Sequence, residues 1–320
     1  MANENQIPKS HSAAVRPILN IGCIGEVMIE IIAGQGNTAL LNVAGDTYNT
    51  AVYLRRALKS PAISVSYITV LGQDAFSDRI FRHAETNGIS TETICRHPTR
   101  TPGLYAIETD GRGERHFTYW RSNSAARTLF DQDGRDPESV LRGLDLVLLS
   151  GITLAILSPL GRSKLYPALD DFRASGGQVA FDSNYRAHLW ESPETARCET
   201  TKMWWRTDIA LPSFEDEMIM FGDQSEDKLL DRFRDFGVTS GALKRGEYGP
   251  RDLGPSGSVC TVVPVENVID TTAAGDSFNA GYLAALVNAE TPQAAMLAGH
   301  TLASKVISRP GAIVDFDDWP

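Results

Sequence analysis

A short run of small residues that ends in an aspartate is the segment best suited to chemistry. Residues 270–276 read DTTAAGD, and the helix-like SFNAGYLAAL follows. Because Ala273, Ala274 and Gly275 are small, an anion can approach the first backbone N–H groups of a helix that starts here. Asp276 would repel a bound phosphate, so it makes sense as a base that takes the proton of an attacking hydroxyl. An ordinary first-turn residue beside a tight glycine corner explains the same letters, and this alternative stays open.

A second cluster, AGDTYN at residues 44–49, follows the first strand-like segment. Gly45 permits close approach of the backbone to a ligand. Asp46 and Asn49 offer hydrogen-bond acceptors and donors to sugar hydroxyls. Capping of the next helix by Asp46 is an equally good explanation.

A third cluster, KRGEYG at residues 244–249, places Gly246 and Gly249 three residues apart after a strand. Such glycines, with Lys244, can bring backbone close to a nucleotide. The order and spacing differ from those of a Walker A loop. A hairpin turn explains this segment as well as a nucleotide site does.

Two arginines and an amide complete the candidates. Asn184 and Arg186 lie in DSNYR at the end of a strand, and Arg121 ends a hairpin. Guanidinium groups suit recognition of carboxylate or phosphate, although arginines are also common on surfaces. The histidines show no metal-ligand spacing, and we interpret them as structural or solvent-exposed.

The elements that must position these residues alternate between strand and helix. Such alternation predicts a mostly parallel sheet with helices on both faces, and ligands then bind at the carboxyl ends of the strands. Apolar periodicity and turn signals predict strands at 18–32, 63–71, 144–152, 177–184, 208–213 and 238–246, a β-rich stretch at 258–265, and helices at 46–59, 75–87, 158–174, 194–206, 213–221, 225–236, 275–289 and 292–307.

A hairpin interrupts the alternation. Residues 103–120 form two strand-like runs around DGRG, a turn signal, which suggests a small β lid beside the main sheet. We expect residues 1–16 to be a disordered tail and residues 17–320 to form a single domain. The lid would come from about 30–42 and 92–122.

Composition excludes several classes of protein. Of 320 residues, 42% are hydrophobic and 22% charged, which is typical of a globular domain. The net charge of −10 argues against a nucleic-acid partner. No apolar run reaches the roughly 18 residues of a membrane span, and no secretory h-region is present. The four cysteines are far apart. We expect a cytoplasmic protein without a membrane partner.

Taken in order, the clusters resemble the ribokinase-like (PfkB) family of carbohydrate kinases over about residues 18–316. Residues 270–283 fit its C-terminal signature, 44–49 its N-terminal signature with Ala44 in place of a glycine, and 244–249 its KxGxxG nucleotide turn. The resemblance implies an α/β ribokinase-like fold, ATP as phosphoryl donor and Mg²⁺ as cofactor. It makes Asp276 the base, with the N–H groups of Ala273, Ala274 and Gly275 around the phosphoryl group.

Within the family the likeness is strongest to the kinases of 2-keto-3-deoxygluconate, a sugar acid, over residues 45–56, 103–127 and 181–190. For the sugar acid, it implies contacts with Gly45, Asp46, Asn49, Tyr105, Tyr119, Arg121 and Arg186. For ATP, it implies contacts with Asn184, Ser213, Lys244, Gly246, Gly249 and Thr272.

The metal is where the chain departs from the family. The family's Asn-x-x-Glu corresponds here to Ser213 and Asp216, with Glu217 next in line. The resemblance therefore leaves Mg²⁺ to Asp216 or Glu217. Residues 309–312 resemble a loop that binds a K⁺-type cation in some members. An exposed lid edge would favour a homo-oligomer.

Three alternatives stay open. The first is the same chemistry on another acid, or on fructose, ribose or adenosine. The second is a non-catalytic regulator that binds a sugar or nucleotide, which would have no use for a base at Asp276. The third, a Rossmann dehydrogenase, requires GxGxxG after the first strand, where residues 22–27 read only GCIGEV.

Overall fold

A computed structural model of the chain describes residues 17–34, 36–109, 115–131 and 135–316. The predicted N-terminal tail, residues 1–16, lies outside the described residues. No helix in the described ranges is both long and apolar enough to cross a bilayer.

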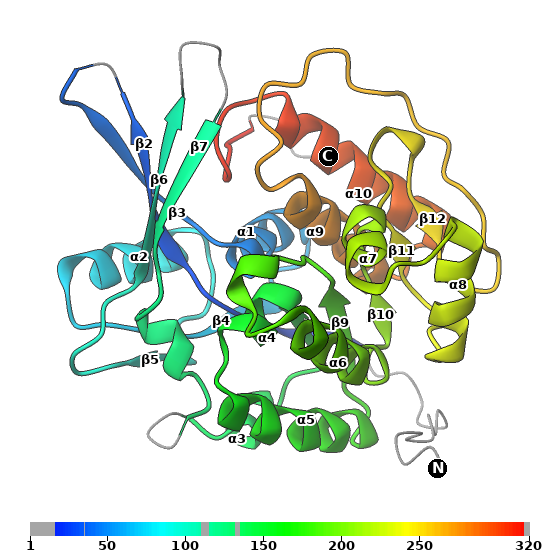
Figure 1. Cartoon of the computed structure of the whole chain (residues 1–320), viewed down its shortest axis with the longest axis horizontal. Helices are drawn as coiled ribbons and strands as arrows, with labels where there is room; N and C mark the ends of the chain where they lie inside the picture. Colours follow the sequence, from blue (N-terminus) through cyan, green and yellow to red (C-terminus); the bar gives the residue numbers. More distant parts are fainter. Residues whose placement is uncertain (1–16, 35, 110–114, 132–134, 317–320) are drawn as a thin grey trace.

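A six-stranded parallel sheet forms the centre of the described structure (Figure 1). Its order is β10 (Ile209–Ala210), β9 (Gln178–Asp182), β8 (Leu146–Ser150), β1 (Asn20–Ile24), β4 (Ser64–Leu71) and β5 (Ile94–Arg96). Every adjacent pair in this sheet is parallel. The strands are rich in buried Ile, Leu and Val, as expected when helices cover both faces.

Successive side chains of the sheet enter two separate cores, because they point to opposite faces. Leu146 and Leu148 of β8 join the first core, whereas Val147 and Leu149 join the second. The helices of the first core are α1 (Asp46–Ala57), α2 (Ala75–Thr86), α9 (Ala274–Val287) and α10 (Pro292–Ile307). The second core contains α3 (Pro137–Leu141), α4 (Gly151–Ile156), α5 (Pro159–Ala174), α6 (Pro193–Trp204) and α8 (Glu226–Asp235), and α7 (Phe214–Phe221) packs against it.

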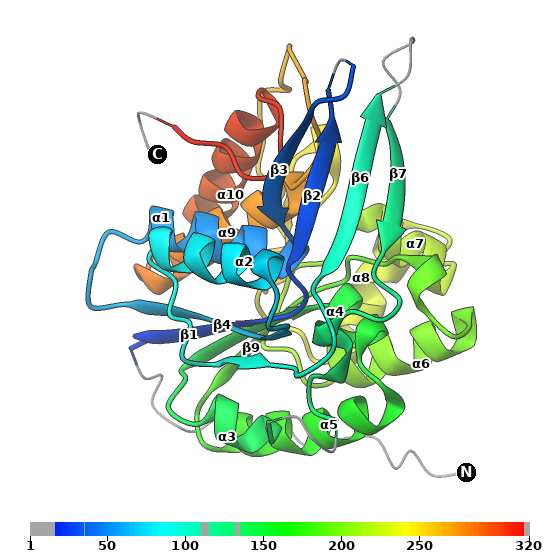
Figure 2. The same ribbon diagram turned by 90° about the vertical axis from the view of Figure 1, so that its left-hand side faces the viewer.

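A second, four-stranded sheet stands out from the central one (Figure 2). Its order is β3 (Ala39–Ala44), β2 (Met28–Ala33), β6 (Gly103–Thr109) and β7 (Arg115–Trp120). The pair β2–β6 is parallel, and the pairs β2–β3 and β6–β7 are antiparallel. The predicted fold class, a mostly parallel sheet flanked by helices with a small β lid, is confirmed.

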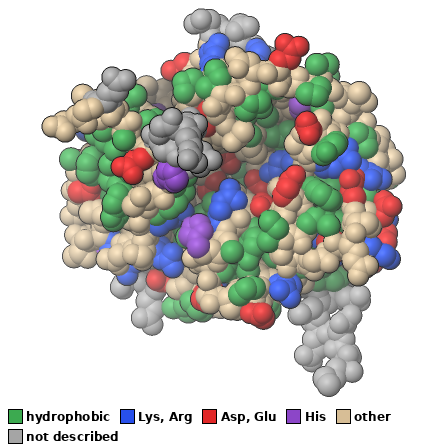
Figure 3. All heavy atoms as spheres, turned by 45° about the horizontal axis from the view of Figure 1, so that its top comes forward, with side chains coloured by type: hydrophobic (Ala, Val, Ile, Leu, Met, Phe, Trp, Pro, Cys, Tyr) green, Lys and Arg blue, Asp and Glu red, His purple; other side chains and the backbone are tan. Residues whose placement is uncertain are grey.

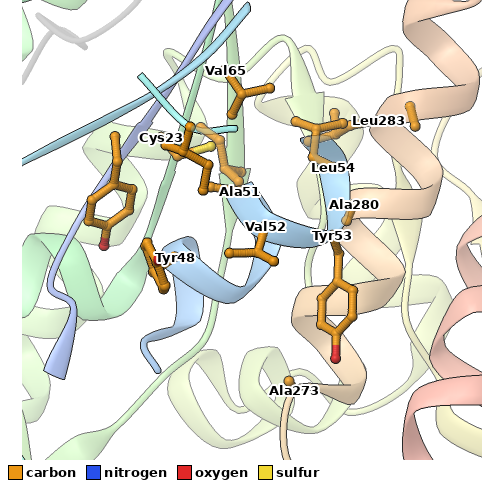
Figure 4. Packing of buried hydrophobic residues seen from close by; sticks show 14 of the residues in the cluster. Cys23, Tyr48, Ala51, Val52, Tyr53, Leu54, Val65, Ala273, Ala280 and Leu283 are labelled. Carbon is orange, nitrogen blue, oxygen red and sulfur yellow. The ribbon is translucent and has the colours of Figure 1, made fainter. Parts of the chain in front are cut away.

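Helices α1 and α9 pack directly against each other (Figure 4). Tyr53 and Leu54 of α1 lie near Ala280 and Leu283 of α9, and all four side chains are buried. This packing brings the amino-terminal turns of the two helices to the same end of the sheet.

Several predicted elements differ from the structure. Residues 18–32 form two strands in different sheets, β1 and β2, and the connection between them is buried: Glu26 is 1% exposed and pairs with Arg121. Residues 258–265 form no named strand: Val259 makes only an isolated bridge and Val263 is 83% exposed. The predicted strand 238–246 shortens to β11 (Ala242–Leu243), which pairs with β12 (Arg251–Asp252). The short helices α3 and α4 were not predicted.

Candidate active site

A cavity of about 890 Å³ opens at the carboxyl ends of the central strands, beside the second sheet. Figure 3 looks onto a hollowed face where acidic and basic side chains gather. Of the predicted site residues, the cavity lining brings together Gly45, Asp46, Asn49, Tyr105, Tyr119, Arg121, Asn184, Arg186, Ser213, Asp216, Lys244, Gly246, Thr272, Ala273, Ala274, Gly275 and Asp276.

The amino terminus of α9 faces this cavity. Its cap, Ala273, has a left-handed backbone with φ of 60° and provides no side-chain cap. The N–H of Ala274 was expected to face the phosphoryl group. It instead donates to the carbonyl of Thr271 at 3.1 Å. Among the described residues, the N–H groups of Ala273, Gly275 and Asp276 have no hydrogen-bond partner. The turn therefore offers donors and the positive end of a helix dipole to an anion.

Asp276, in the first turn of α9, is held by α1. Asn49 Nδ2 donates to Asp276 Oδ2 at 2.8 Å, and Thr50 Oγ1 donates to the Asp276 carbonyl at 3.1 Å. Burial raises the pKa of Asp276 to about 8, and the charges of Asp46 and Asp182 act in the same direction. A carboxylate with a pKa near neutrality is suited to general-base catalysis.

Asp46 is the second carboxylate of the cavity, at the start of α1. It accepts hydrogen bonds from Ser150 Oγ and from Asn184 Nδ2, the latter at 3.2 Å. Burial raises its pKa, and the hydrogen bond from Ser150 lowers it. Its neighbour Gly45 is required sterically, since a Cβ there would collide with the carbonyl oxygen of Glu26.

Three polar side chains form a closed triangle next to this turn. Lys244 Nζ donates to Asp182 Oδ1 at 2.9 Å and to Asn279 Oδ1 at 3.1 Å, and Asn279 Nδ2 donates to Asp182 Oδ2 at 2.6 Å. Sequence reasoning missed Asp182 and Asn279. The signals were present, because Asp182 opens the DSNYR run at the end of a predicted strand and Asn279 lies three residues after Asp276 on the same helix face.

The second sheet contributes a wall with aromatic rings. Tyr105 and Tyr119 stack with their ring centroids 5.7 Å apart, and the Tyr105 hydroxyl donates to Glu30 Oε1 at 2.6 Å. Arg121 is only 8% exposed and is paired with the buried Glu26, so its charge is already balanced. Arg186 is half exposed, 3.9 Å from Asp216 Oδ1. The two arginines thus stand in different electrostatic settings, which their sequence did not reveal.

The neighbouring carboxylates of α7, Asp216 and Glu217, have different surroundings. Asp216 lines the cavity and accepts from the Tyr185 N–H at 3.1 Å, and burial raises its pKa. Glu217 is fully buried outside the cavity, with Oε2 3.0 Å from Arg232 Nη1. Asp216 is therefore the better placed of the two metal-ligand candidates. No group of three His, Cys, Asp or Glu residues in the described ranges could hold a metal by itself.

Gly249 is placed differently from Lys244 and Gly246, the other predicted residues of the KRGEYG turn. Gly249 does not line the cavity; its φ is 75°, and a Cβ there would collide with the carbonyl of Cys260. The glycine is needed for the backbone there, so a direct nucleotide contact by Gly249 is not supported. His188 and His300 also line the cavity; His188 is exposed, as interpreted from the sequence, and His300 is half-buried beside Ser304.

Comparison with known proteins agrees with this geometry. Residues 19–319 match the family described as pfkB family carbohydrate kinase. A 2-dehydro-3-deoxygluconokinase of Dickeya dadantii is 41% identical over 307 residues, covering 94% of this chain and 98% of that protein. Among solved structures, 2-dehydro-3-deoxygluconokinase of Thermotoga maritima superposes with a TM-score of 0.81 at 20% identity, covering 93% and 96% of the two chains.

A fructokinase of Xylella fastidiosa, solved with bound ATP, superposes with a TM-score of 0.78 at 20% identity, covering 92% of this chain and 93% of the other. The match to the family covers almost all of this chain, including the turn before α9 and both sheets. The chain therefore belongs to the pfkB family of carbohydrate kinases.

Proposed function

We propose that this kinase transfers the γ-phosphoryl group of ATP to the primary hydroxyl of 2-keto-3-deoxygluconate, giving the 6-phosphate and ADP. The observation that carries the proposal is the 41% identity, over nearly the whole chain, to a relative named for this substrate. The cavity supports it, because it presents a buried base and two arginines where a sugar acid and a nucleotide would meet.

The proton of the acceptor hydroxyl would go to Asp276. The acceptor oxygen forms a bond to the γ-phosphorus as the bond from that phosphorus to the β,γ-bridging oxygen breaks, and ADP leaves. Asn49 fixes the orientation of the carboxylate through its 2.8 Å hydrogen bond. Holding both reactants in line supplies a large part of the acceleration in such reactions.

The amino terminus of α9 would hold the transferring group. The N–H groups of Ala273, Gly275 and Asp276, which have no partner among the described residues, can donate hydrogen bonds to its negatively charged oxygens without rearrangement. Thr272, Ser213, Gly246 and Asn184 line the same cavity and would contact the nucleotide.

The residues present fit a magnesium ion bound together with ATP. Mg²⁺ usually takes one or two carboxylates and completes its shell with phosphates and water, and Asp216 supplies such a carboxylate in the cavity lining. When bound, the ion would neutralise phosphate charge. The K⁺-type cation at residues 309–312, the cytoplasmic location and the homo-oligomer stay predictions.

The sugar acid would lie between α1 and the second sheet. Gly45, Asp46 and Asn49 would meet its hydroxyls, and Tyr105 and Tyr119 would cover it. Arg186 is the more available partner for the carboxylate, since Arg121 is paired with Glu26.

A substrate panel tests the proposal. Purified protein with Mg²⁺ and ATP is offered 2-keto-3-deoxygluconate, gluconate, fructose, ribose and adenosine, and ADP formation is followed. We expect kcat/KM for 2-keto-3-deoxygluconate to exceed that for each other compound by at least about tenfold, or roughly 1.4 kcal/mol. A preference for fructose, ribose or adenosine would replace the sugar acid by a neutral acceptor.

A further inference from the structure

The triangle of Asp182, Lys244 and Asn279 holds a lysine against the turn before α9. Its corners come from the end of β9, the residue after β11 and the second turn of α9. Asp182 and Asn279 are 4% and 1% exposed, and the Lys244 side chain is 13% exposed. A flexible lysine side chain is thus fixed by two buried acceptors, which are themselves joined by a hydrogen bond.

The ammonium group lies beside the candidate anion site. Lys244 Nζ is 3.5 Å from the position that a Cβ on Gly275 would take, and no other described atom from outside this turn of α9 comes within 4 Å of that position. An ammonium group has three donors, and the triangle uses two of them. One donor therefore remains for an anion seated against the N–H groups of Ala273, Gly275 and Asp276.

Other cations around the cavity are less suited to this task. Arg245 is occupied by Glu226 at 3.0 Å and by the Gly249 carbonyl. Arg186 is half exposed and has Asp216 within 3.9 Å. Lys244 Nζ lies against the turn of α9, and three carboxylates, Asp46, Asp182 and Asp276, line the same cavity.

We infer that Lys244 is a catalytic residue that contacts the γ-phosphoryl group during transfer, and that Asp182 and Asn279 are positioning residues that aim its ammonium group. This inference rests on the proposed function, because it assumes that ATP is the donor. Fixed cationic groups aimed at a transferring phosphoryl group stabilise the charge that develops there. Without the triangle, the long side chain would lose more entropy on reaching the same position.

The first experiment needs no sugar. Binding of ADP and of β,γ-imido-ATP, both with Mg²⁺, is measured by calorimetry for the wild type and for Lys244→Gln, which removes the charge but keeps a donor for Asp182. We expect the affinity for the imido analogue to fall about tenfold or more, and that for ADP to stay within about twofold. Equal losses for both nucleotides, or no loss for either, would overturn the inference.

Because this measurement leaves out the acceptor, its outcome does not depend on which sugar is the substrate. Lys228→Met is the matched control: Lys228 lies on α8 with its side chain 71% exposed, and its removal should change neither affinity. Lys244→Met is the second variant if Lys244→Gln does not fold, with folding checked by thermal melting.

A double-mutant cycle tests the positioning role. With the acceptor that the wild type uses, Asn279→Ala should lower kcat roughly tenfold and leave KM for the sugar unchanged. In the Lys244→Gln background the same change should have almost no further effect, since there is no ammonium group left to aim. An equal loss in both backgrounds would show that Asn279 has only a structural role.

Discussion

Asn49 Nδ2 donates to Asp276 Oδ2 at 2.8 Å, joining residues 227 positions apart in the sequence. The bond favours the charged form of Asp276, whereas burial and the neighbouring carboxylates disfavour it. Replacement of Asn49 by Leu should therefore raise the pKa of Asp276 further. The acid limb of the pH profile should move to higher pH, and an unmoved limb would contradict this coupling.

The wild-type pH profile follows from the same carboxylate. As a base, Asp276 must be deprotonated, so kcat/KM for the sugar should fall roughly tenfold per pH unit below a pKa of about 8. Initial rates between pH 5.5 and 9.5 would measure this limb, with a stable buffer mixture and saturating ATP. A profile that is flat from pH 6 to 9 would show that Asp276 is not the group that titrates.

Replacement of Asp276 by Asn should lower kcat by about 10²–10⁴-fold, the usual contribution of a general base. Nucleotide affinity should stay close to that of the wild type, because the backbone N–H groups of the turn are retained. Calorimetry with ADP and steady-state rates measure the two effects. Near-normal turnover would exclude the role assigned to Asp276.

The difference in stability between the Asp276→Asn protein and the wild type should depend on pH in a defined direction. The folded-state pKa of Asp276 is raised from 3.8 to about 8. The stabilisation of its protonated form is therefore complete below about pH 4 and is lost as the pH rises through about 8.

Asn mimics the protonated form, so the variant should gain stability relative to the wild type between pH 5 and pH 9. With about 1.4 kcal/mol per pKa unit, we expect a gain of at least about 2 kcal/mol in the free energy of unfolding, measured by urea titration. A constant difference across this range would contradict the prediction.

The two arginines of the cavity should differ in what their removal costs. Arg121→Ala leaves Glu26 buried without its partner, so we expect a loss of about 3–5 kcal/mol in the free energy of unfolding, together with weaker binding of the sugar acid. Arg186→Ala removes a half-exposed side chain and should change stability by less than about 1 kcal/mol. It should raise KM for the sugar acid more than KM for ATP. Equal changes in both KM values would count against a carboxylate contact.

Asp216 and Glu217 form a matched pair for the metal. Asp216→Asn should raise the Mg²⁺ concentration needed for half-maximal activity by roughly 10–100-fold. Glu217→Gln should leave this concentration unchanged and lower the melting temperature, because Glu217 balances Arg232 outside the cavity. The reverse pattern would return Glu217 to the site.

Sequence patterns predicted most of the helices and strands, and nearly all of the predicted site residues line the cavity, because they lie in short turns at strand ends. About half of the residues that line the cavity were not predicted. The patterns did not predict which partner each charge has. Arg121, which follows β7, pairs with Glu26, which lies between β1 and β2. Glu26 is one of the few charged residues in an otherwise apolar segment, so the sequence did not single it out as a partner. The orientation of Asp216 against Glu217 depends on how α7 is rotated on its neighbours. Residues 258–265 have strand-like letters, yet their side chains are largely exposed and lack a strand partner beyond one bridge.

Because α1 packs against α9, the site can be completed only after α9 has been synthesised. The half of the site that would bind the sugar, at Gly45, Asp46 and Asn49, is made within the first fifth of the chain, whereas Asp276 is added in the last fifth. A nascent chain that stops before α9 lacks both the base and the surface that covers Tyr53 and Leu54. Such a chain would leave apolar side chains of α1 uncovered on the face that α9 occupies in the complete protein, so burial of this face and completion of the site come together.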